Sequence, residues 1–320
     1  MIPNRLYTLL VGAGLLVLLS TQLMAQQLPL FSMYRHQSTL LNPAALPSDY
    51  FARDQNLTFG AAYRRQWTGI DNAPTTQTLH GNYFFKDLNG FAPSLGGYLM
   101  NDQTGPTGMT GLYVNGGGFI SEDPYYSGIG IGLSFGLVQY RLNTAELRLR
   151  DPGDILLGET QTQLFPDVGL GVFAYGRLGN DDLIYGGVSL PQVLGLNLAF
   201  RGENGEFETQ RVRHYYANAG FYHFLDNDNF IEPSVWVRYV NGADISVDLN
   251  VRYQMVQNLY IGAGGNSSGA FHVETGLMLG DTYTFDNTFQ IGYSFTRWFS
   301  QFGPDAGPTH EFNLSVGLDR

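Results

Sequence analysis

Side chains that commonly carry catalysis or hold metals are few in this chain and are not grouped. The chain has 320 residues and no cysteine, which removes disulfides, thiolate metal sites and thiol nucleophiles together. Its histidines are His36, His80, His214, His223, His272 and His310. No serine stands in a nucleophile-elbow context, and no histidine pair has a metal-ligand spacing with carboxylates nearby. The sequence therefore predicts a non-enzymatic protein with no catalytic residues, no cofactor and no metal site.

Charged side chains at alternate positions of strand-like segments form the next group of candidates. They are Glu232, Arg238, Asp248, Arg252, Glu274 and Glu311. Their positions place them on the less apolar face of each segment, and a charge that becomes buried there must be paired or hydrated. Two interpretations stay open. The charges belong to a salt-bridged or water-filled lumen that holds a barrel in shape, or they line a selective solute path, although no solute is singled out.

The elements that position these charges are long alternating segments. In residues 127–140, Ile129, Ile131 and Leu133 alternate with glycines and a serine. In residues 244–253, an aliphatic face alternates with a polar one. A soluble β-sandwich would alternate too. However, many of these segments reach about 9–11 residues, the length that crosses a bilayer when tilted, whereas typical soluble strands have about 5–6.

Fourteen such segments follow one another. They cover residues 57–67, 75–85, 92–101, 107–120, 127–140, 167–177, 183–190, 210–224, 229–240, 244–253, 258–265, 269–280, 283–297 and 310–318. An even number lets an antiparallel barrel close with no unpaired edge in lipid. We therefore predict an all-β fold, a single transmembrane antiparallel β-barrel of about 14 strands of outer-membrane type, over residues 55–320.

Connection lengths predict the orientation of this barrel. The long connections 68–74, 141–166, 191–209 and 298–309 all follow odd-numbered strands. Outer-membrane barrels have long extracellular loops and short periplasmic turns. The long connections are therefore expected outside the cell.

Two segments precede the barrel. Residues 1–25 combine Arg5, a short apolar run and a small residue, Ala25, which predicts a secretory signal peptide cleaved near Ala25; an uncleaved anchor is the alternative. Residues 26–54 do not alternate and contain Pro29, Pro43 and Pro47, so they predict an extended periplasmic or lumenal segment. The net charge of −11 argues against nucleic-acid binding.

A set of motif residues lies in the N-terminal segment and the first hairpin loop. They are Pro29, Tyr34, Asn42, Pro43, Ala44, Arg64, Gln66, Trp67, Gly69, Ala73 and Pro74. Spacing alone would make them architectural: Asn before Pro opens turns, and Trp anchors at membrane interfaces. The identities of these residues, however, resemble those at the start of the PorP/SprF family of outer-membrane proteins of the type IX secretion system.

The resemblance implies a non-enzymatic outer-membrane barrel that serves protein export and, in some bacteria, gliding motility. Its implied partners are outer-membrane lipid and either other type IX secretion components, which it would anchor, or the C-terminal sorting domain of one secreted surface protein. The sequence leaves these two roles open. A passive or hydrophobic-solute channel of similar architecture is the alternative from another functional class.

The N-terminal segment cannot fold alone, because it has three prolines and little apolar surface. We hypothesise that it tucks into the barrel against lumen-facing Arg64 and Gln66, closes the pore and shapes a partner surface. Both side chains could donate to backbone carbonyls that a proline-interrupted chain leaves unpaired. A loose tail is the competing interpretation.

Overall fold

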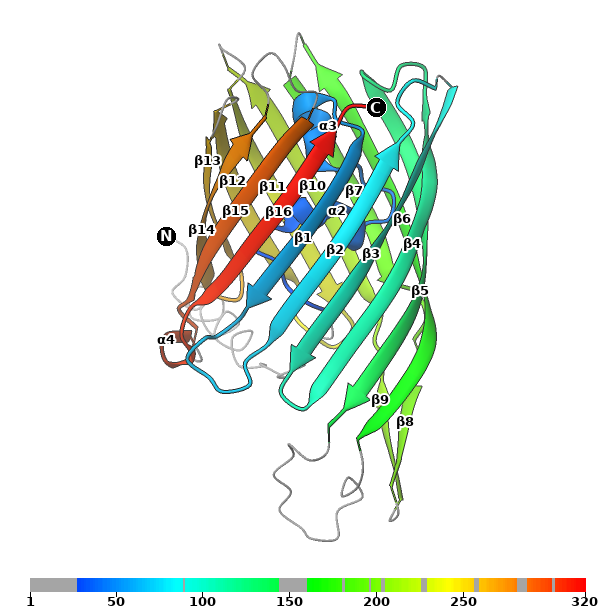
Figure 1. Cartoon of the computed structure of the whole chain (residues 1–320), viewed down its shortest axis with the longest axis vertical. Helices are drawn as coiled ribbons and strands as arrows, with labels where there is room; N and C mark the ends of the chain where they lie inside the picture. The colour runs from blue at the N-terminus through cyan, green and yellow to red at the C-terminus, as the bar shows by residue number, and fades with distance from the viewer. Residues whose placement is uncertain are drawn as a thin grey trace, which may run out of the picture.

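The chain forms one closed β-barrel (Figure 1). The computed structural model describes residues 28–88, 90–143, 160–179, 182–195, 197–202, 205–225, 229–255, 259–280, 287–300 and 303–320. Fourteen antiparallel strands close the barrel, as the alternation predicts. The predicted signal peptide, Gln26, the middle of the 141–166 connection and the turn at 281–282 lie outside the described residues.

Each predicted segment corresponds to one barrel strand. The barrel strands are β1 Leu57–Arg65, β2 Thr75–Phe84, β3 Gly90–Thr104, β4 Thr107–Ser121, β5 Ser127–Leu142, β6 Gln161–Leu178, β7 Asp182–Gln192, β10 His214–Phe224, β11 Phe230–Val240, β12 Ser246–Met255, β13 Leu259–Asn266, β14 Ala270–Leu279, β15 Asn287–Trp298 and β16 Thr309–Leu318. The remaining elements are η1 Tyr34–Gln37, α2 Ser38–Leu41, α3 Ser48–Arg53, α4 Gly303–Ala306, β8 Asn197–Gly202 and β9 Gly205–Gln210.

The barrel closes where the first strand meets the last. Strand β1 pairs with β2 on one side and with β16 on the other, from Leu57↔Leu318 to Arg65↔His310. Each barrel strand thus has two neighbours, and no row of backbone N–H and C=O groups faces lipid unpaired.

Two connections differ from the sequence expectation. The 191–209 connection, expected to be a plain loop, contains the two-stranded sheet β8–β9. The 141–166 connection is shorter than expected, because β5 runs to Leu142 and β6 begins at Gln161. Pro166 lies inside β6, opposite Leu137. A proline usually marks the end of a strand, and for this reason the strand was predicted from the sequence to start after Pro166.

The alternation separates a lipid face from a lumen face. In β14, Phe271, Val273 and Leu277 are exposed on the outer wall, while His272 and Glu274 are buried inside. The same division recurs in β5 and β12. Among the described residues, no helix is long and apolar enough to cross a membrane.

The lumen is occupied by residues 28–54, called the plug below (Figure 1). Leu28 packs against a cluster that contains Leu142 and Phe165, at the end of the barrel with the long connections. At the opposite end, Tyr50 donates to the carbonyl of Pro124 in the β4–β5 turn. The plug therefore passes through the barrel from the mouth that carries the long connections to the mouth that carries the short turns.

Candidate functional site: the plugged lumen

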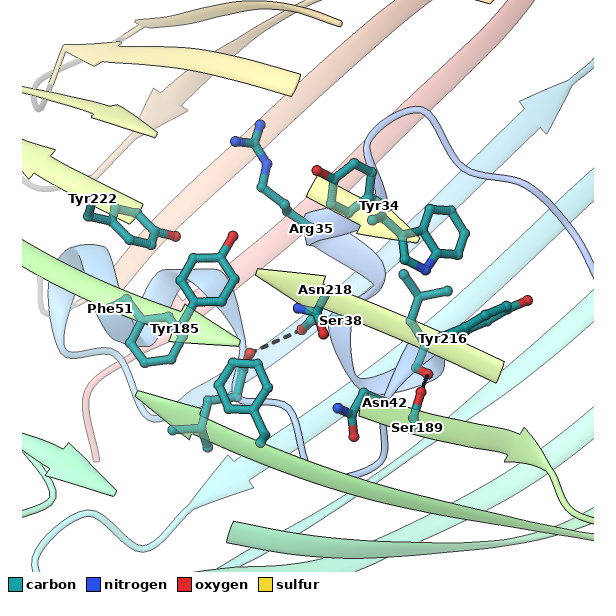
Figure 2. A pocket seen from close by; sticks show the side chains of 14 residues that line it. Tyr34, Arg35, Ser38, Asn42, Phe51, Tyr185, Ser189, Tyr216, Asn218 and Tyr222 are labelled. Carbon is teal, nitrogen blue, oxygen red and sulfur yellow. Dashed lines mark hydrogen bonds between the residues drawn. The ribbon is translucent and has the colours of Figure 1, made fainter. Parts of the chain in front are cut away.

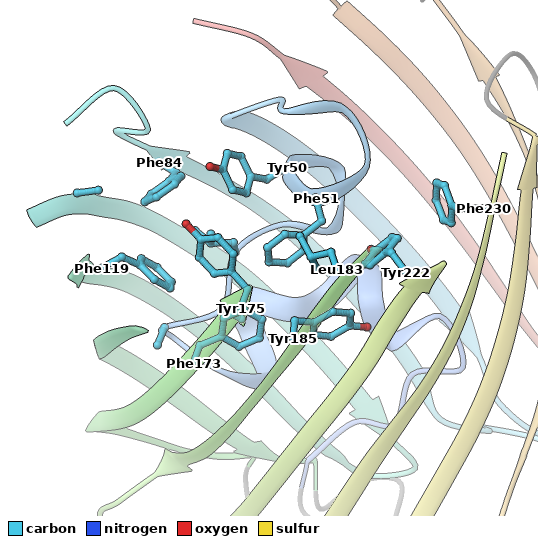
Figure 3. Close-up of a cluster of buried hydrophobic side chains, with 14 residues drawn as sticks. Tyr50, Phe51, Phe84, Phe119, Phe173, Tyr175, Leu183, Tyr185, Tyr222 and Phe230 are labelled. Carbon is cyan, nitrogen blue, oxygen red and sulfur yellow. The ribbon is translucent and has the colours of Figure 1, made fainter. Parts of the chain in front are cut away.

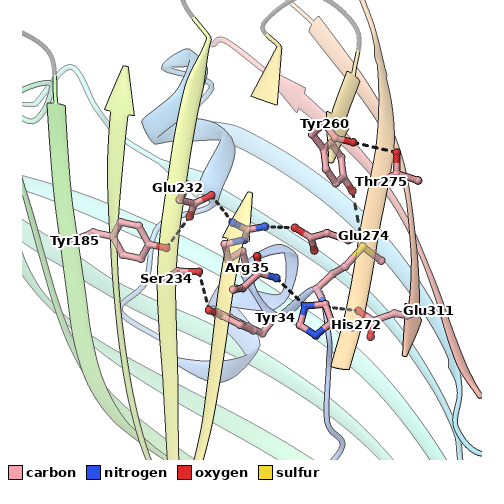
Figure 4. A network of polar contacts seen from close by, with 12 residues as sticks. Tyr34, Arg35, Tyr185, Glu232, Ser234, Tyr260, His272, Glu274, Thr275 and Glu311 are labelled. Atoms are coloured by element: carbon pink, nitrogen blue, oxygen red, sulfur yellow. Dashed lines mark hydrogen bonds and ion pairs between the residues drawn. The ribbon is translucent and has the colours of Figure 1, made fainter. Parts of the chain in front are cut away.

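Arg35 is the centre of the polar contacts in the lumen (Figure 4). Its Nη1 lies 2.6 Å from Oε2 of Glu232 on β11, and its Nη2 binds Glu274 on β14. Tyr185 donates to the other oxygen of Glu232 at 2.8 Å. All these side chains are buried, so the short η1 helix places one guanidinium where it bridges two carboxylates on non-adjacent strands.

Glu311 forms a second polar contact, with the start of the plug. Its carboxylate accepts the backbone N–H groups of Ser32 at 2.8 Å and Met33 at 3.1 Å. It also pairs at 2.8 Å with Arg64, its neighbour across the β1–β16 seam. One buried carboxylate thus accepts from two plug amides and pairs with one wall guanidinium, and hydrogen bonds to charged groups contribute about 1.5–3 kcal/mol each.

The expected partners of Arg64 and Gln66 differ from those in the structure. Arg64 donates to Oγ of Ser32 at 2.9 Å and to Glu311, not to a backbone carbonyl. Gln66 is half-buried, and its backbone N–H donates to the carbonyl of Pro74. Its side chain is not among the described partners of the plug. Carbonyls of the plug instead accept from Ser189, which donates to Leu41 O at 2.6 Å, and from Asn115.

The Asn42-Pro43-Ala44 motif makes a turn within the plug. Oδ1 of Asn42 accepts the backbone N–H of Ala44 at 2.9 Å, as an Asx turn does. Its Nδ2 donates to the carbonyl of Val172 on β6 at 3.1 Å. The motif therefore forms its own turn and also binds the wall.

Two wall glycines make room for this turn. A Cβ at Gly171 would lie 1.9 Å from Oδ1 of Asn42, and a Cβ at Gly132 would lie 2.4 Å from the carbonyl oxygen of Pro43. Real Cβ atoms do not approach other atoms so closely. The glycines of β5 and β6 therefore form a cradle that is complementary to the motif.

Aromatic rings hold the other half of the plug (Figure 3). Phe51 of α3 stacks on Tyr185 with centroids 5.6 Å apart and on Phe173 at 6.1 Å. Tyr50 meets Phe84 edge-on at 5.0 Å. The rings of α3 thus pack on β2, β6 and β7, although β2 is far from the other two strands in the sequence. Aromatic pairs add about 0.5–1.5 kcal/mol beyond the area they bury.

Polar contacts tie this end of the plug to the barrel. Lys86 Nζ donates to the carbonyl of Asp54 at 2.9 Å, and Arg320 N–H donates to Oδ1 of Asn56 at 2.9 Å. Burial raises the pKa of the Asp54 carboxyl, although Arg177 and Lys86 oppose that shift. The connection from the plug into β1 is therefore fixed to both a turn and the C-terminus.

Little space remains between plug and wall. The cavity between the plug and strands β7, β10 and β11 is lined by Tyr34, Phe51, Tyr185 and other rings and measures about 30 Å³ (Figure 2). Two others beside the plug measure about 20 and 10 Å³. Each has room for a water molecule or two, which is too small for a solute.

Buried arginines and buried carboxylates of the lumen are equal in number. The buried arginines are Arg35, Arg64, Arg211, Arg238 and Arg252, and the buried lumen carboxylates are Asp167, Glu232, Asp248, Glu274 and Glu311. Arg35 is the one member of this set that comes from the plug. Among these buried groups, removal of the plug would leave five wall carboxylates facing four wall arginines.

The six charges singled out from the sequence all lie inside the barrel. Glu232, Glu274 and Glu311 bind the plug, as described above. Arg238 pairs with Asp248, and the guanidinium of Arg252 lies 3.7 Å from the ring centroid of Tyr260. Sequence reasoning missed Arg35, because the plug has no alternation from which a buried position could be inferred.

At the mouth that carries the long connections, the first-loop motif after β1 contacts the segment that leads into β16. Gly69 N–H donates to the carbonyl of Ala306 in α4 at 2.9 Å, and Thr68 N–H donates to that of Pro308 at 2.9 Å. Trp67 meets Trp298 edge-on at 6.0 Å. Ala73 is buried in the same loop. These contacts reinforce the seam between β1 and β16 where it leaves the membrane.

Remaining motif residues lie in the plug. Pro29 is buried at the mouth with the long connections, and Tyr34 Oη shares a 2.7 Å hydrogen bond with Oγ of Ser234. Within the described part of the chain, no three His, Asp or Glu side chains are placed to hold a metal ion.

Comparisons with known proteins agree with this architecture. The family model described as "Type IX secretion system membrane protein PorP/SprF" matches residues 23–316. No curated protein matches the chain.

Three similar solved structures are described as hydrocarbon channels or transporters. The CymD monoaromatic hydrocarbon channel is 9% identical, with a TM-score of 0.52 over 91% of this chain and 99% of that one. The toluene transporter TodX of P. putida is 9% identical, with a TM-score of 0.52 and coverages of 88% and 94%. The toluene transporter TbuX of Ralstonia pickettii is 10% identical, with a TM-score of 0.51 and coverages of 88% and 93%. At such identities these similarities concern the fold alone.

Proposed function

Because the chain belongs to the PorP/SprF family of type IX secretion system membrane proteins, we propose that it serves protein export as a plugged outer-membrane barrel. It acts as a docking component, not as an enzyme or an open pore. The observation that supports this most directly is that residues 28–54 fill the lumen and leave water-sized cavities beside them. A closed barrel can still bind partners at both of its mouths.

The two mouths suit different partners. The mouth with the short turns would face the periplasm, where the half-exposed carboxylates of Asp54 and Asp319 offer a site for anchoring other secretion components. The mouth with the long connections would face outside, where the first loop and α4 offer a surface for the sorting domain of a secreted surface protein. Deletion of the gene tests the two roles. Loss of export of one substrate would support the partner role, and loss of export of many substrates would support the anchoring role.

We also propose that residues 1–25 direct the chain to the outer membrane and are removed. The mass of the mature protein, purified from outer membranes, tests cleavage near Ala25. A mature chain that still begins at residue 1 would contradict this.

Removal of the plug is the decisive experiment. The variant lacks residues 28–48 and keeps Gln26, Gln27 and the rest of the chain. We expect it to fold into a heat-modifiable barrel, to conduct ions in planar bilayers and to fail in export, because it loses both the closure and the surfaces that the plug supports. The full-length chain, produced at the same level, is the control.

Normal export by the deletion variant together with an unchanged conductance would mean that the plug serves neither closure nor docking. Full export with a raised conductance would mean that the plug closes the pore but is not needed for docking. Either result would overturn the proposal as stated.

A hydrophobic-solute channel is the second candidate, and it is favoured by the named activities of the structural neighbours. In this chain such a path would require the plug to move, since the aromatic cavity holds about 30 Å³. Uptake of a monoaromatic hydrocarbon into liposomes that contain the full-length protein tests it. Uptake equal to that of protein-free liposomes would exclude this candidate.

A further inference from the structure

A small polar cavity lies between the plug and the strands at the barrel seam. It measures about 20 Å³, and its lining includes His36 and Ser38 of the plug, Thr58 of β1, His80 of β2 and Ser315 of β16. Strands β16, β1 and β2 are neighbours in the wall, so the cavity joins the plug to the place where the barrel closes. A cavity of this size holds one or two ligands of the size of water.

Three of the side chains that line this cavity have a polar atom without a hydrogen-bond partner among the described residues. The three atoms are Nε2 of His36, Nδ1 of His80 and Oγ1 of Thr58, and all three are buried. His36 and Thr58 are only 8% and 3% exposed. The two serines of the lining already donate to acceptors of their own. Buried polar groups are almost always paired, so three free groups around one cavity indicate a ligand inside it.

Cationic groups surround this part of the plug. Apart from burial, the strongest influences on the His36 ring are the positive charges of Arg252 and Arg35. Arg35 is paired with wall carboxylates, but no ion pair between Arg252 and a carboxylate occurs in the described part of the chain. The guanidinium of Arg252 lies over the Tyr260 ring instead, and that ring also lies 6.1 Å from the His36 ring. A negative charge beside His36 would therefore be attracted by its surroundings.

The charge and the donors of the cavity distinguish between the ligands that fit its size. Imidazole nitrogens can bind a metal ion, but the nearby arginines oppose a divalent cation, and no third His, Asp or Glu of the described residues completes such a site. Water could bond to the three groups but would leave the positive potential unanswered. A monatomic anion answers both, because two imidazole N–H groups and a hydroxyl can all donate to it.

We propose that this cavity binds one chloride ion, which bridges the plug to β1 and β2. Each of the two imidazoles carries its proton on the nitrogen that lines the cavity, Nε2 in His36 and Nδ1 in His80, and donates it to the ion. The hydroxyl of Thr58 is the third donor. The ion thereby gives the polar side of the plug a contact that the chain alone does not supply. This site is independent of the proposed role in secretion.

The first test locates the ion. The full-length protein is crystallised with bromide in place of chloride, and diffraction is measured at the bromine absorption edge. We expect an anomalous peak between His36, Thr58 and His80. Density at this place without an anomalous signal would identify bound water and would overturn the proposal.

The second test measures what the ion contributes to stability. Urea titration of the protein in bilayers is carried out at constant ionic strength, with chloride replaced stepwise by gluconate, which is too large for the cavity. For a ligand that binds the folded state alone, the folding equilibrium constant rises about tenfold for each tenfold rise in ligand concentration above the dissociation constant. We expect this dependence for chloride and for bromide. A folding equilibrium constant that does not change with chloride would contradict the proposal.

Two variants each remove one donor. Thr58→Val keeps the shape of the side chain and removes the hydroxyl, and His80→Phe keeps a ring and removes its N–H. Each variant should raise the dissociation constant for chloride roughly tenfold, the usual effect of one hydrogen bond to a charged group. Because the two substitutions lie on different strands, a folding defect in one leaves the other informative.

The matched control removes a hydroxyl from another place in the lumen. Ser294 of β15 is also buried, and its Oγ also lacks a partner among the described residues, but it does not line this cavity. Ser294→Ala should therefore keep the chloride dependence of the parent chain. Unchanged dependence in both Thr58→Val and His80→Phe, or an equal loss in Ser294→Ala, would overturn the proposal.

Discussion

The two halves of the plug are held by opposite chemistry. Toward the mouth with the long connections, Ser32 and Arg35 bind carboxylates of the wall. Toward the other mouth, Tyr50 and Phe51 pack among aromatic rings, and the polar contacts are made by the Tyr50 hydroxyl and by Asp54 at the end of the plug. One continuous segment thus has a charged half and an aromatic half.

The charged and aromatic contacts of the plug have different roles: ion pairs position it, and buried rings anchor it. A buried ion pair gains little net free energy, because desolvation offsets most of the attraction, but it penalises every arrangement that leaves a charge unpaired. Buried rings contribute through the area that they remove from water. The charged pairs therefore fix where the plug lies, and buried rings supply free energy that keeps it there, Phe51 in the aromatic half and Tyr34 against Trp236 in the charged half.

The largest effect is expected in the aromatic half. Phe51→Ala should lower the free energy of unfolding by about 3–5 kcal/mol, because a buried ring is replaced by a cavity. Urea titration of the protein in bilayers, read by heat-modifiable gel mobility, measures it. Phe299→Ala is the control, since that ring is 71% exposed. A loss below about 1 kcal/mol would place the anchor elsewhere.

The charged half should respond differently to the loss of its cation. Arg35→Met leaves Glu232 and Glu274 without their shared cation, at a cost of about 3 kcal/mol that water entering the lumen would reduce. The lumen also gains a net negative charge. We expect intermittent conductance with a preference for cations in planar bilayers.

Neutral partners provide the control for that result. The triple variant Arg35→Met, Glu232→Gln and Glu274→Gln removes the unpaired charges, so both stability and closure should recover in part. Phe51→Ala should show no cation preference even if it conducts. The same selectivity in both variants would remove the proposed distinction between the two halves.

A third prediction compares the plug with the wall. Leu249 faces lipid and Asn250 is buried in the lumen. Leu249→Arg should cost about 2–4 kcal/mol near the bilayer midplane. A lumen substitution is usually tolerated, but Asn250→Arg should also be costly here, since the plug leaves water-sized space.

Deletion of residues 28–48 should separate these two costs. In that variant the lumen fills with water, so Asn250→Arg should become nearly neutral, while Leu249→Arg should keep its full penalty. Urea titration of six chains, the full-length parent and the deletion variant each without a substitution and with either arginine substitution, gives the coupling. A penalty for Asn250→Arg that persists without the plug would mean that wall packing alone disfavours arginine.

Local rules predicted the wall, and non-local contacts determined the lumen. Lipid on one side imposes a period of two on every strand, so the fourteen strands and the inward position of Glu232 and Glu274 follow from alternation. The path of the plug depends on contacts between Asn42 and strands about 130 residues away. No periodicity describes such contacts.

The sequence nevertheless contains an indication of the plug's position in the lumen. Gly132 and Gly171 occupy inward positions of otherwise regular strands, and an interior strand glycine often marks a close backbone approach. Together with an unpaired Asn-Pro turn they could have indicated that a segment enters the lumen. The partners of Arg35 could not have been identified, because several inward carboxylates were equally available.

The smallest perturbation tests the direction in which the plug runs. Leu28 lies at the mouth with the long connections, so the start of the plug should face outside the cell. The parent chain has no cysteine, which makes single-cysteine labelling unambiguous. Leu28→Cys should react with an impermeant maleimide on whole cells, as should Thr104→Cys at the exposed end of β3. Asp87→Cys, in an exposed turn at the opposite mouth, should react only after permeabilisation. If Leu28→Cys behaves like Asp87→Cys while Thr104→Cys is labelled, the segment enters from the periplasm, and its charged half cannot occupy the outer mouth.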